Sequence, residues 1–235
     1  MTIADKTILV TGANRGIGLA LVEEGLRRGA RRIYAGTRHP IAQVDGRVTP
    51  LFLDVTNGAQ IAEAVDTVKS LDILINNAGV ALYDDLSDPT AIEQQLAVNL
   101  FGPYRVIQSF LPLLTESHGT IVNNLSLAAL ASLPITPAYS ISKAAAYSMT
   151  QSLRALLARQ NVTVQAVLTG PTDTEMSRGL DIPKASPRSV AEAIFDGIER
   201  GEEDIFPDPL SRAMSNGWLD SAAKELERQN ASLVA

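Results

Sequence analysis

Cysteine is absent from the 235-residue sequence, and histidine occurs only twice, at His39 and His118. The chain therefore has no disulfide framework, no thiolate nucleophile and no thiolate metal ligand. Two histidines outside any His-Glu-x-x-His pattern are too few for most metal sites, so we predict surface positions for both and no metal. The lack of cysteine leaves the redox compartment open and fits the cytoplasm.

Long apolar runs and excess positive charge are also missing. No stretch approaches the length of a membrane span, and residues 1–6 carry charge where a signal peptide needs an apolar core. We therefore expect a cytoplasmic protein without a membrane partner. The net charge of -6 argues against nucleic acid as a partner. The 46% hydrophobic and 20% charged residues are ordinary for a globular protein.

Apolar segments of strand length alternate with helical segments along the chain. Strands are expected at Thr7–Val10, Arg32–Gly36, Pro50–Leu53, Leu71–Ile75, Gly119–Leu125 and Val162–Leu168. This alternation predicts an α/β fold, a doubly wound (Rossmann) parallel sheet of about seven strands with helices on both faces. With no repeat or linker to divide it, 1–235 is predicted to be one domain, with a substrate loop at about 175–187 and a helical tail at about 211–232.

A glycine-rich turn, residues 11–18, follows the first expected strand and leads into a helix. Such a turn lets backbone N–H groups and the helix N-terminus meet a phosphate, which suggests a nucleotide. Its spacing, Gly-x-x-x-Gly-x-Gly, differs from the Gly-x-Gly-x-x-Gly fingerprint, and glycine turns also serve as plain connectors. The turn alone leaves both interpretations open.

An acidic residue is missing at the carboxyl end of the second expected strand, where a doubly wound fold places the adenosine ribose. Thr37 and Arg38 stand there, and Arg15 lies in the glycine turn. A guanidinium binds a 2'-phosphate in bidentate geometry, whereas a carboxylate would repel it. The sequence therefore favours NADP over NAD, unless both arginines are ordinary surface charges.

Tyr139 and Lys143 fall in the first turns of the helix expected from Pro137 onward. Residues four apart share a helix face, so the phenol and the ammonium point the same way. Ionising a free phenol at pH 7 costs roughly 4 kcal/mol, and a nearby positive charge is expected to reduce that cost. Tyr139 is thus predicted to be an acid or base, although Tyr-x-x-x-Lys is common and its tyrosine often only packs.

Residues 90–115 are predicted to form one long helix with two prolines inside. Pro103 has no N–H, so the carbonyl of Asn99 loses its helical partner. We expect a kink that leaves this oxygen free for water; the alternative is that the prolines only bend a packing helix. The helix after Pro137 shows no clear polar face, which suggests that a second subunit covers it.

Taken together, several of these motifs resemble the short-chain dehydrogenase/reductase family, in particular its compact subgroup that reduces carbonyl groups. The resemblance spans roughly residues 5–176 and is carried by Thr11 to Gly18, Asn76 to Gly79, Asn99, Ser126, Tyr139 and Lys143. It implies that Tyr139 protonates the carbonyl oxygen as hydride arrives from the nicotinamide, and that Ser126 hydrogen-bonds that oxygen. It implies further that Lys143 holds the nicotinamide ribose and that Asn99 holds a water linking Lys143 to solvent.

For the cofactor NADP(H), the resemblance implies three groups of contacts, beside Thr37 and Arg38 at the ribose position. The phosphates would meet Gly12, Asn14, Arg15 and Ile17; the adenosine Asp54, Val55, Asn77, Ala78 and Gly79; and the carboxamide Thr172 and Thr174, with Gly170 and Pro171 also expected to contact the cofactor. Two departures stand out. The family's Pro-Gly appears here as Thr169-Gly170-Pro171, and residues 202–207 lack a Gly-Gly ending, which leaves a homodimer and a homotetramer both open.

The leading hypothesis is an NADPH-dependent oxidoreductase that reduces a ketone or aldehyde carbonyl to an alcohol, with Tyr139 as general acid. One alternative is an NADP(H)-binding redox sensor without catalysis. Another is a reductase of carrier-protein-bound 3-ketoacyl chains, for which Arg178, Lys184 and Arg188 supply a basic rim.

Overall fold

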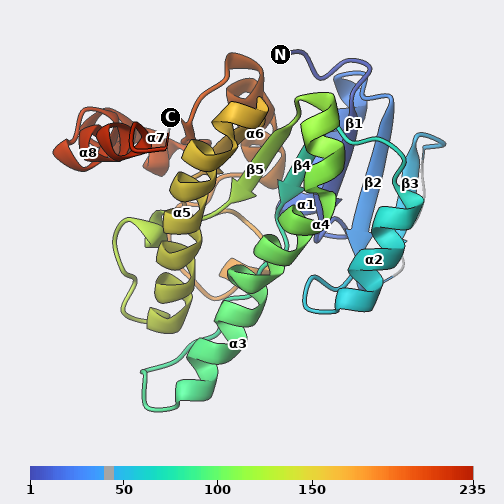
Figure 1. Cartoon of the computed structure of the whole chain (residues 1–235). Coiled ribbons are helices and arrows are strands. Elements are labelled where there is room, and N and C mark those ends of the chain that lie inside the picture. The colour runs from blue at the N-terminus through green and yellow to red at the C-terminus, as the bar shows by residue number, and fades with distance from the viewer. Residues whose placement is uncertain (40–44, 235) are drawn as a thin grey trace.

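A parallel sheet with helices on both faces forms the body of the protein (Figure 1). The computed structural model describes residues 1–39 and 45–234. Within them the sheet has seven strands in the order β3-β2-β1-β4-β5-β6-β7, which confirms the predicted doubly wound fold. The strands are β1 (Thr7–Thr11), β2 (Arg32–Thr37), β3 (Val48–Phe52), β4 (Ile73–Asn76), β5 (Thr120–Asn124), β6 (Thr163–Val167) and β7 (Asp204–Ile205). Sequence analysis did not identify β7, which is only two residues long.

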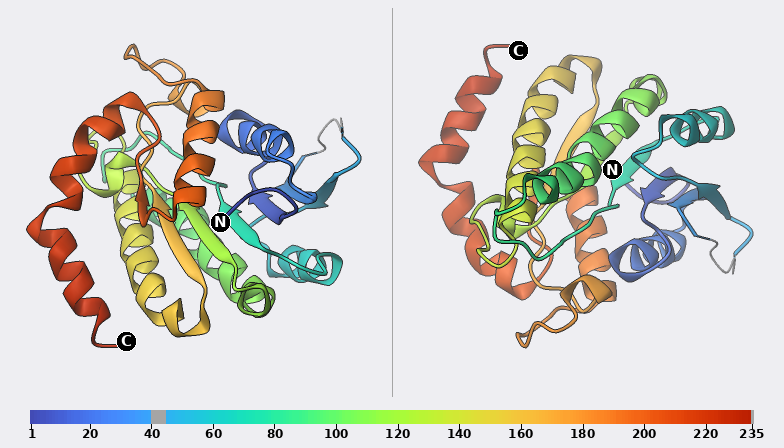
Figure 2. Two further views of the ribbon diagram at one scale, coloured as in Figure 1. Left: turned by 90° about the horizontal axis from the view of Figure 1, so that it is seen from above. Right: turned by 90° about the horizontal axis from the view of Figure 1, so that it is seen from below.

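The helices form one layer on each side of the sheet (Figure 2). Helices α1 (Gly16–Arg27) and α6 (Pro187–Arg200) pack on one face, and α2 (Gly58–Thr67), α4 (Phe101–Ser117) and α5 (Pro137–Leu157) pack on the other. Buried strands supply both cores, because successive side chains point to opposite faces. On β1, Ile8 and Val10 enter the α1/α6 core and Leu9 enters the other.

The strand order places a crevice above β1 and β4. The chain leaves β1 toward β2 and β3 on one side, then returns to β4 on the other side of β1. The loops that follow β1 and β4 therefore diverge, and ligands of open α/β sheets bind in the crevice that this leaves at the carboxyl ends of the strands. No helix of the described residues has the length and apolar character needed to cross a membrane.

The predicted single helix over 90–115 is wrong, because two helices occupy this stretch. Helix α3 (Pro89–Asn99) ends one residue before α4 begins, with Leu100 between them at φ −114° and ψ −62°. Pro103 has no N–H to give to the Asn99 carbonyl, and the next amide, Tyr104 N, donates to Leu100 O at 3.1 Å. The break thus comes directly after Asn99, the residue whose carbonyl has no amide partner at position 103.

The C-terminal tail is helical as predicted and consists of α7 (Pro209–Leu219) and α8 (Ala222–Ala231). A buried charge cluster docks it on the sheet edge. Lys224 Nζ lies 2.9 Å from Asp204 on β7 and 3.0 Å from Glu227. Asp204 also accepts from Trp218 Nε1 at 3.0 Å and pairs with Arg154 of α5 at 2.8 Å. Because these partners come from β7, α5 and both tail helices, the cluster fixes the tail to the body.

The remaining short elements are 3₁₀ turns at η1 (Leu127–Ala129), η2 (Ala158–Gln160) and η3 (Glu175–Ser177). Two of them, η1 and η3, follow β5 and β6 and line the crevice.

Candidate active site

The glycine turn between β1 and α1 can be built only with glycine at several positions. Gly12 has φ +67°, and a Cβ there would lie 2.9 Å from Ala78 Cα. A Cβ on Gly18 would lie 2.0 Å from the Gly12 carbonyl oxygen. The turn therefore sits against the segment after β4, and the N-terminus of α1 at Gly16 opens toward the crevice.

A cavity of about 1200 Å³ lies at the carboxyl ends of the strands. Every predicted cofactor residue lines it, as do Ser126, Tyr139 and Lys143; of the predicted site residues only Asn99 does not. The cofactor set comprises Gly12, Asn14, Arg15, Ile17, Thr37, Arg38, Asp54, Val55, Asn77, Ala78, Gly79, Gly170, Pro171, Thr172 and Thr174. The structure thus brings together residues that lie up to 162 positions apart, from Gly12 to Thr174.

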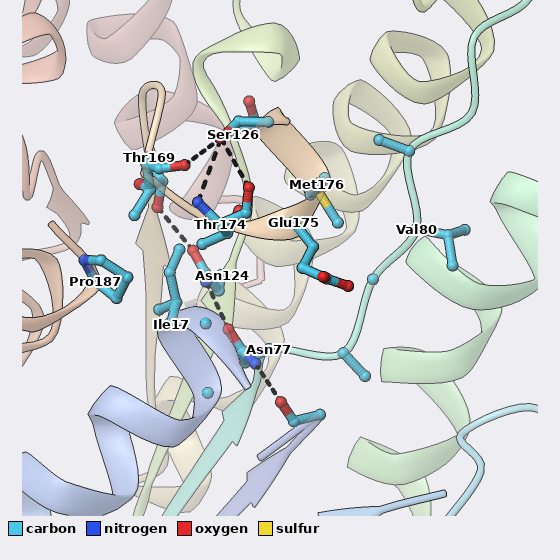
Figure 3. A pocket seen from close by; sticks show the side chains of 18 of the residues that line it. Ile17, Asn77, Val80, Asn124, Ser126, Thr169, Thr174, Glu175, Met176 and Pro187 are labelled. Atoms are coloured by element: carbon cyan, nitrogen blue, oxygen red, sulfur yellow. Dashed lines mark hydrogen bonds between the residues drawn. The ribbon is translucent and has the colours of Figure 1, made fainter. Parts of the chain in front are cut away.

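A row of side-chain hydrogen bonds ties the strand ends together beneath this cavity (Figure 3). Thr169 Oγ1 donates to Asn124 Oδ1 at 2.8 Å, and Asn124 Nδ2 donates to Asn77 Oδ1 at 2.9 Å. Asn77 Nδ2 then donates to the carbonyl oxygens of Thr11 at 3.0 Å and Gly12 at 3.2 Å. The amide of Asn77 is therefore occupied in holding the glycine turn, and its side chain positions the cavity floor.

Ser126 and Tyr139 meet at the wall of the cavity. Ser126 caps η1, its Oγ accepting from Ala128 N at 3.1 Å, and Tyr139 stands in the first turn of α5. Burial raises the pKa of the Tyr139 phenol, and a side-chain hydrogen bond from Ser126 only partly opposes this. The pKa of Tyr139 was expected to be lowered and is instead raised by loss of solvent, so the phenol keeps its proton at neutral pH.

Lys143 lies one helical turn after Tyr139, as predicted. Its Nζ is 5.6 Å from the centre of the Tyr139 ring and donates to the Asn124 carbonyl oxygen at 3.0 Å. Burial lowers the pKa of Lys143 to about 8, because the charged form loses its hydration. Most Lys143 side chains are therefore still cationic at neutral pH, beside a phenol that is not ionised.

Asn99 is buried behind the cavity, where its side chain is fully engaged. Oδ1 accepts from Val80 N at 2.9 Å, and Nδ2 donates to Val80 O and to Ser142 Oγ, each at 2.9 Å. A Cβ on Gly79 would lie 3.2 Å from Asn99 Oδ1 and 3.7 Å from Lys143 Nζ. Asn99 thus holds the segment after β4 close to Lys143, while its predicted water contact stays a prediction.

The two arginines of the predicted ribose site differ in their partners. Arg38 has a side chain that is 58% exposed, with Nη1 3.8 Å from Asp54 Oδ2. Arg15 Nη1 instead lies 2.5 Å from Glu175 Oε2, so it joins the glycine turn to η3. Thr37 Oγ1 donates to His39 O at 3.0 Å and shapes its own turn. Arg38 is therefore the guanidinium better placed to meet a 2'-phosphate.

Asp208 is a site residue that sequence analysis missed. Its Oδ2 accepts from Gly170 N at 2.7 Å, and its Oδ1 caps α7 by accepting from Ser211 N at 3.0 Å. A Cβ on Gly170 would lie 2.5 Å from Asp208 Oδ1, so glycine is required for this contact. The Asp-Pro pair at 208–209 is a helix-start signal, but nothing in the sequence indicates the second contact, 38 residues away.

Comparison with known proteins identifies the family. Residues 6–184 match the family model described as short chain dehydrogenase. This chain belongs to the short-chain dehydrogenase family. A short-chain dehydrogenase from Burkholderia cenocepacia J2315, solved in complex with NADP, is 38% identical with a TM-score of 0.89, over 97% of this chain and 98% of that one.

Two further relatives of this short-chain dehydrogenase were found among curated proteins. An uncharacterized oxidoreductase of Staphylococcus saprophyticus is 31% identical over 217 residues, 84% of this chain and 93% of the relative. A short-chain dehydrogenase of Penicillium crustosum is 38% identical over 183 residues, 72% of this chain and 66% of the relative. The prediction that the chain is an oxidoreductase of this family is confirmed.

Proposed function

We propose that this short-chain dehydrogenase uses NADPH to reduce the carbonyl group of a ketone or aldehyde to an alcohol. The observation that carries the proposal is a half-buried phenol, Tyr139, beside the Ser126 hydroxyl and one turn from Lys143 in the wall of a large cavity. A group that must deliver a proton to an oxygen has to carry that proton beforehand, and a phenol whose pKa is raised carries it at neutral pH.

The cavity suits a dinucleotide with a 2'-phosphate. Because Gly12 and Gly18 have no side chains, the turn can lie close to the bound phosphates, and the α1 N-terminus faces the cavity with uncapped N–H groups. At the ribose position Arg38 offers charge-assisted hydrogen bonds to a 2'-phosphate. The NADP complex of the Burkholderia relative supports the same cofactor.

The roles of the residues follow from their positions. NADPH, when bound, would supply a hydride. Ser126 would donate a hydrogen bond to the carbonyl oxygen, and Tyr139 would give that oxygen its proton. Lys143, cationic and held by the Asn124 carbonyl, would hold the nicotinamide ribose hydroxyls and stabilise the phenolate that remains.

The residues after β6 would position the nicotinamide carboxamide. Thr172 Oγ1 donates to Gly170 O at 3.3 Å, and Thr174 caps η3 beside the glycine turn, with its methyl 3.1 Å from where a Gly16 Cβ would be. Asp54 and Val55, in the segment after β3, would contact the adenine. Tight placement of this kind supplies the orientation that hydride transfer needs.

A homodimer across α4 and α5 is also proposed. Both helices show large apolar side chains to the outside, namely Phe101, Tyr104, Ile141 and Leu156. Exposed large apolar side chains on the outer helices are typical of a protein interface. A tetramer would require a second interface as well.

Turnover of NADPH in the presence of a panel of ketones and aldehydes tests the main proposal. Tyr139→Phe should lower kcat by at least about 100-fold, the contribution expected of a general acid, without changing NADPH affinity. Tyr34→Phe, the same change in a tyrosine outside the cavity, is the control. Full activity of Tyr139→Phe, or no reduction of any carbonyl compound, would refute the proposal.

The carrier-protein alternative would use three basic residues that have partners at the surface. Arg178 pairs with Glu175 at 2.6 Å, Arg188 pairs with Glu192 at 3.0 Å, and Lys184 Nζ donates to Ser177 O at 2.8 Å. Both ion pairs are exposed and therefore weak, so loss of carrier binding on reversing these charges would support this alternative. The redox-sensor alternative needs the cavity but no proton donor. Tight binding of NADPH without reduction of any carbonyl compound would favour a sensor.

A further inference from the structure

We infer that the substrate is an uncharged, largely apolar carbonyl compound, and that the C-terminal helix α7 supplies a wall of its binding site. This inference rests on the proposed reductase function and deepens it. The catalytic end of the cavity is the end where Ser126 and Tyr139 lie, and α7 is fastened beside it.

Apolar side chains dominate the catalytic end of the cavity. Three segments far apart in the sequence contribute to it: the loop after η1, the loop that contains η3, and α7. Their large apolar members line the cavity and are each between 40% and 54% exposed: Leu133, Ile135, Met176, Ile182, Leu210 and Met214. Exposed apolar groups that converge on a cavity indicate a ligand whose surface is apolar.

Most charged groups at this end pair with one another. Glu175 Oε2 and Oε1 are taken by Arg15 at 2.5 Å and Arg178 at 2.6 Å. Arg188 is paired with Glu192, and Asp173, which also lines the cavity, would repel an anion. Lys143 would be occupied by the nicotinamide ribose, so among the described residues at this end a carboxylate or phosphate on the substrate would meet only cations that already pair with carboxylates.

The position of α7 makes its apolar residues part of the site. Asp208 is only 2% exposed and joins the first turn of α7 to Gly170, next to the expected nicotinamide position. Leu210 and Met214 are four residues apart on this helix, hence on one face, and both reach the cavity. Since Trp218 bonds to Asp204 at the other end, α7 is held as a fixed wall.

A chain-length series tests the inference. Methyl ketones with lengthening alkyl chains should show kcat/KM rising up to about fourfold per added methylene, the gain for a fully buried CH₂, until the cavity is filled. Keto acids and hydroxylated ketones of matching length should be at least about tenfold poorer, because their polar groups find no partners.

Substitutions on α7 test whether this helix causes the preference for apolar substrates. The double variant Leu210→Asp/Met214→Asp should flatten the chain-length dependence and leave the affinity for NADPH unchanged. Because the two side chains are 54% and 40% exposed, the variant should still fold. Leu226→Asp is the matched control, since Leu226 is 55% exposed on α8 and does not line the cavity.

The outcomes separate the two proposals. If a keto acid or a sugar is reduced better than the matching alkyl ketone, the inference fails and the reductase function stands. If the double variant keeps the wild-type chain-length dependence, α7 is not the wall. If no carbonyl compound is reduced at all, the proposed function fails and takes the inference with it.

Discussion

Replacing Asp208 should damage stability and activity together, because this one carboxylate makes two contacts of different kinds. It caps α7 through Ser211 N and holds Gly170 N inside the candidate active site. Loss of an N-cap costs about 1 kcal/mol. Loss of a buried hydrogen bond to a charged group costs about 1.5–3 kcal/mol. Asp208→Ala should therefore lower the free energy of unfolding by about 2.5–4 kcal/mol, which leaves most single-domain proteins folded.

The chain offers a matched control in Asp88. It also precedes a proline, and it caps α3 by accepting from Thr90 N at 2.9 Å, but it lies outside the cavity. Asp88→Ala should cost only the cap, about 1 kcal/mol. Urea unfolding gives both free energies, and steady-state kinetics should show a higher KM for NADPH in Asp208→Ala alone. Equal losses of stability, or unchanged kinetics in Asp208→Ala, would refute the double role of this carboxylate.

Three further predictions concern charged residues. Arg38→Asp should remove or invert the preference for NADPH over NADH, measured as the ratio of kcat/KM values, since it exchanges a phosphate-binding cation for a repelling anion; an unchanged ratio would rule out this role. Burial lowers the pKa of Lys143 to about 8, so kcat/KM for carbonyl reduction should decline as the pH rises through 8. The same pH profile of Lys143→Met should lack this decline. Burial tends to raise the pKa of Asp204, but Arg154 and Lys224 outweigh it and lower the value, so its stabilisation is present at neutral pH and lost as the pH falls below about 4. Asp204→Asn should thus cost about 3–5 kcal/mol in unfolding experiments at pH 7, and a loss independent of pH down to 3 would contradict this account.

Local sequence patterns predicted most of the fold correctly. Helices α5 and α6 begin at Pro137 and Pro187, and α6 ends before Gly201, because proline fits the first turn of a helix and glycine adopts the left-handed conformation that ends one. Strand β7 escaped notice since two residues carry no periodic pattern. The helix over 90–115 was predicted as one element because a proline at position 103 indicates a disturbance but not whether the helix bends or stops.

The candidate site divides in the same way. The glycine turn, Ser126, Tyr139 and Lys143 were predicted because their spacing is local or forms a recognisable order. The pKa of Tyr139 was expected to fall, yet it rises, since the degree of burial depends on segments far away in the chain. The cofactor contact of Asn77 and the water contact of Asn99 stay predictions; the sequence did not indicate that their side-chain amides also hold backbone groups that shape the cavity.

The sequence by itself determined the doubly wound sheet, the glycine turn at the end of β1 and the phenol and amine one turn apart on α5. These features depend on propensities and spacings within a few residues, which can be read directly from the sequence. Only the tertiary structure decided that Asp208 reaches Gly170, that α7 brings Leu210 and Met214 to the cavity, and that Lys224 is buried against Asp204. Such contacts join residues that no local pattern relates, and they exist only once packing of the tail against the sheet edge has brought them together.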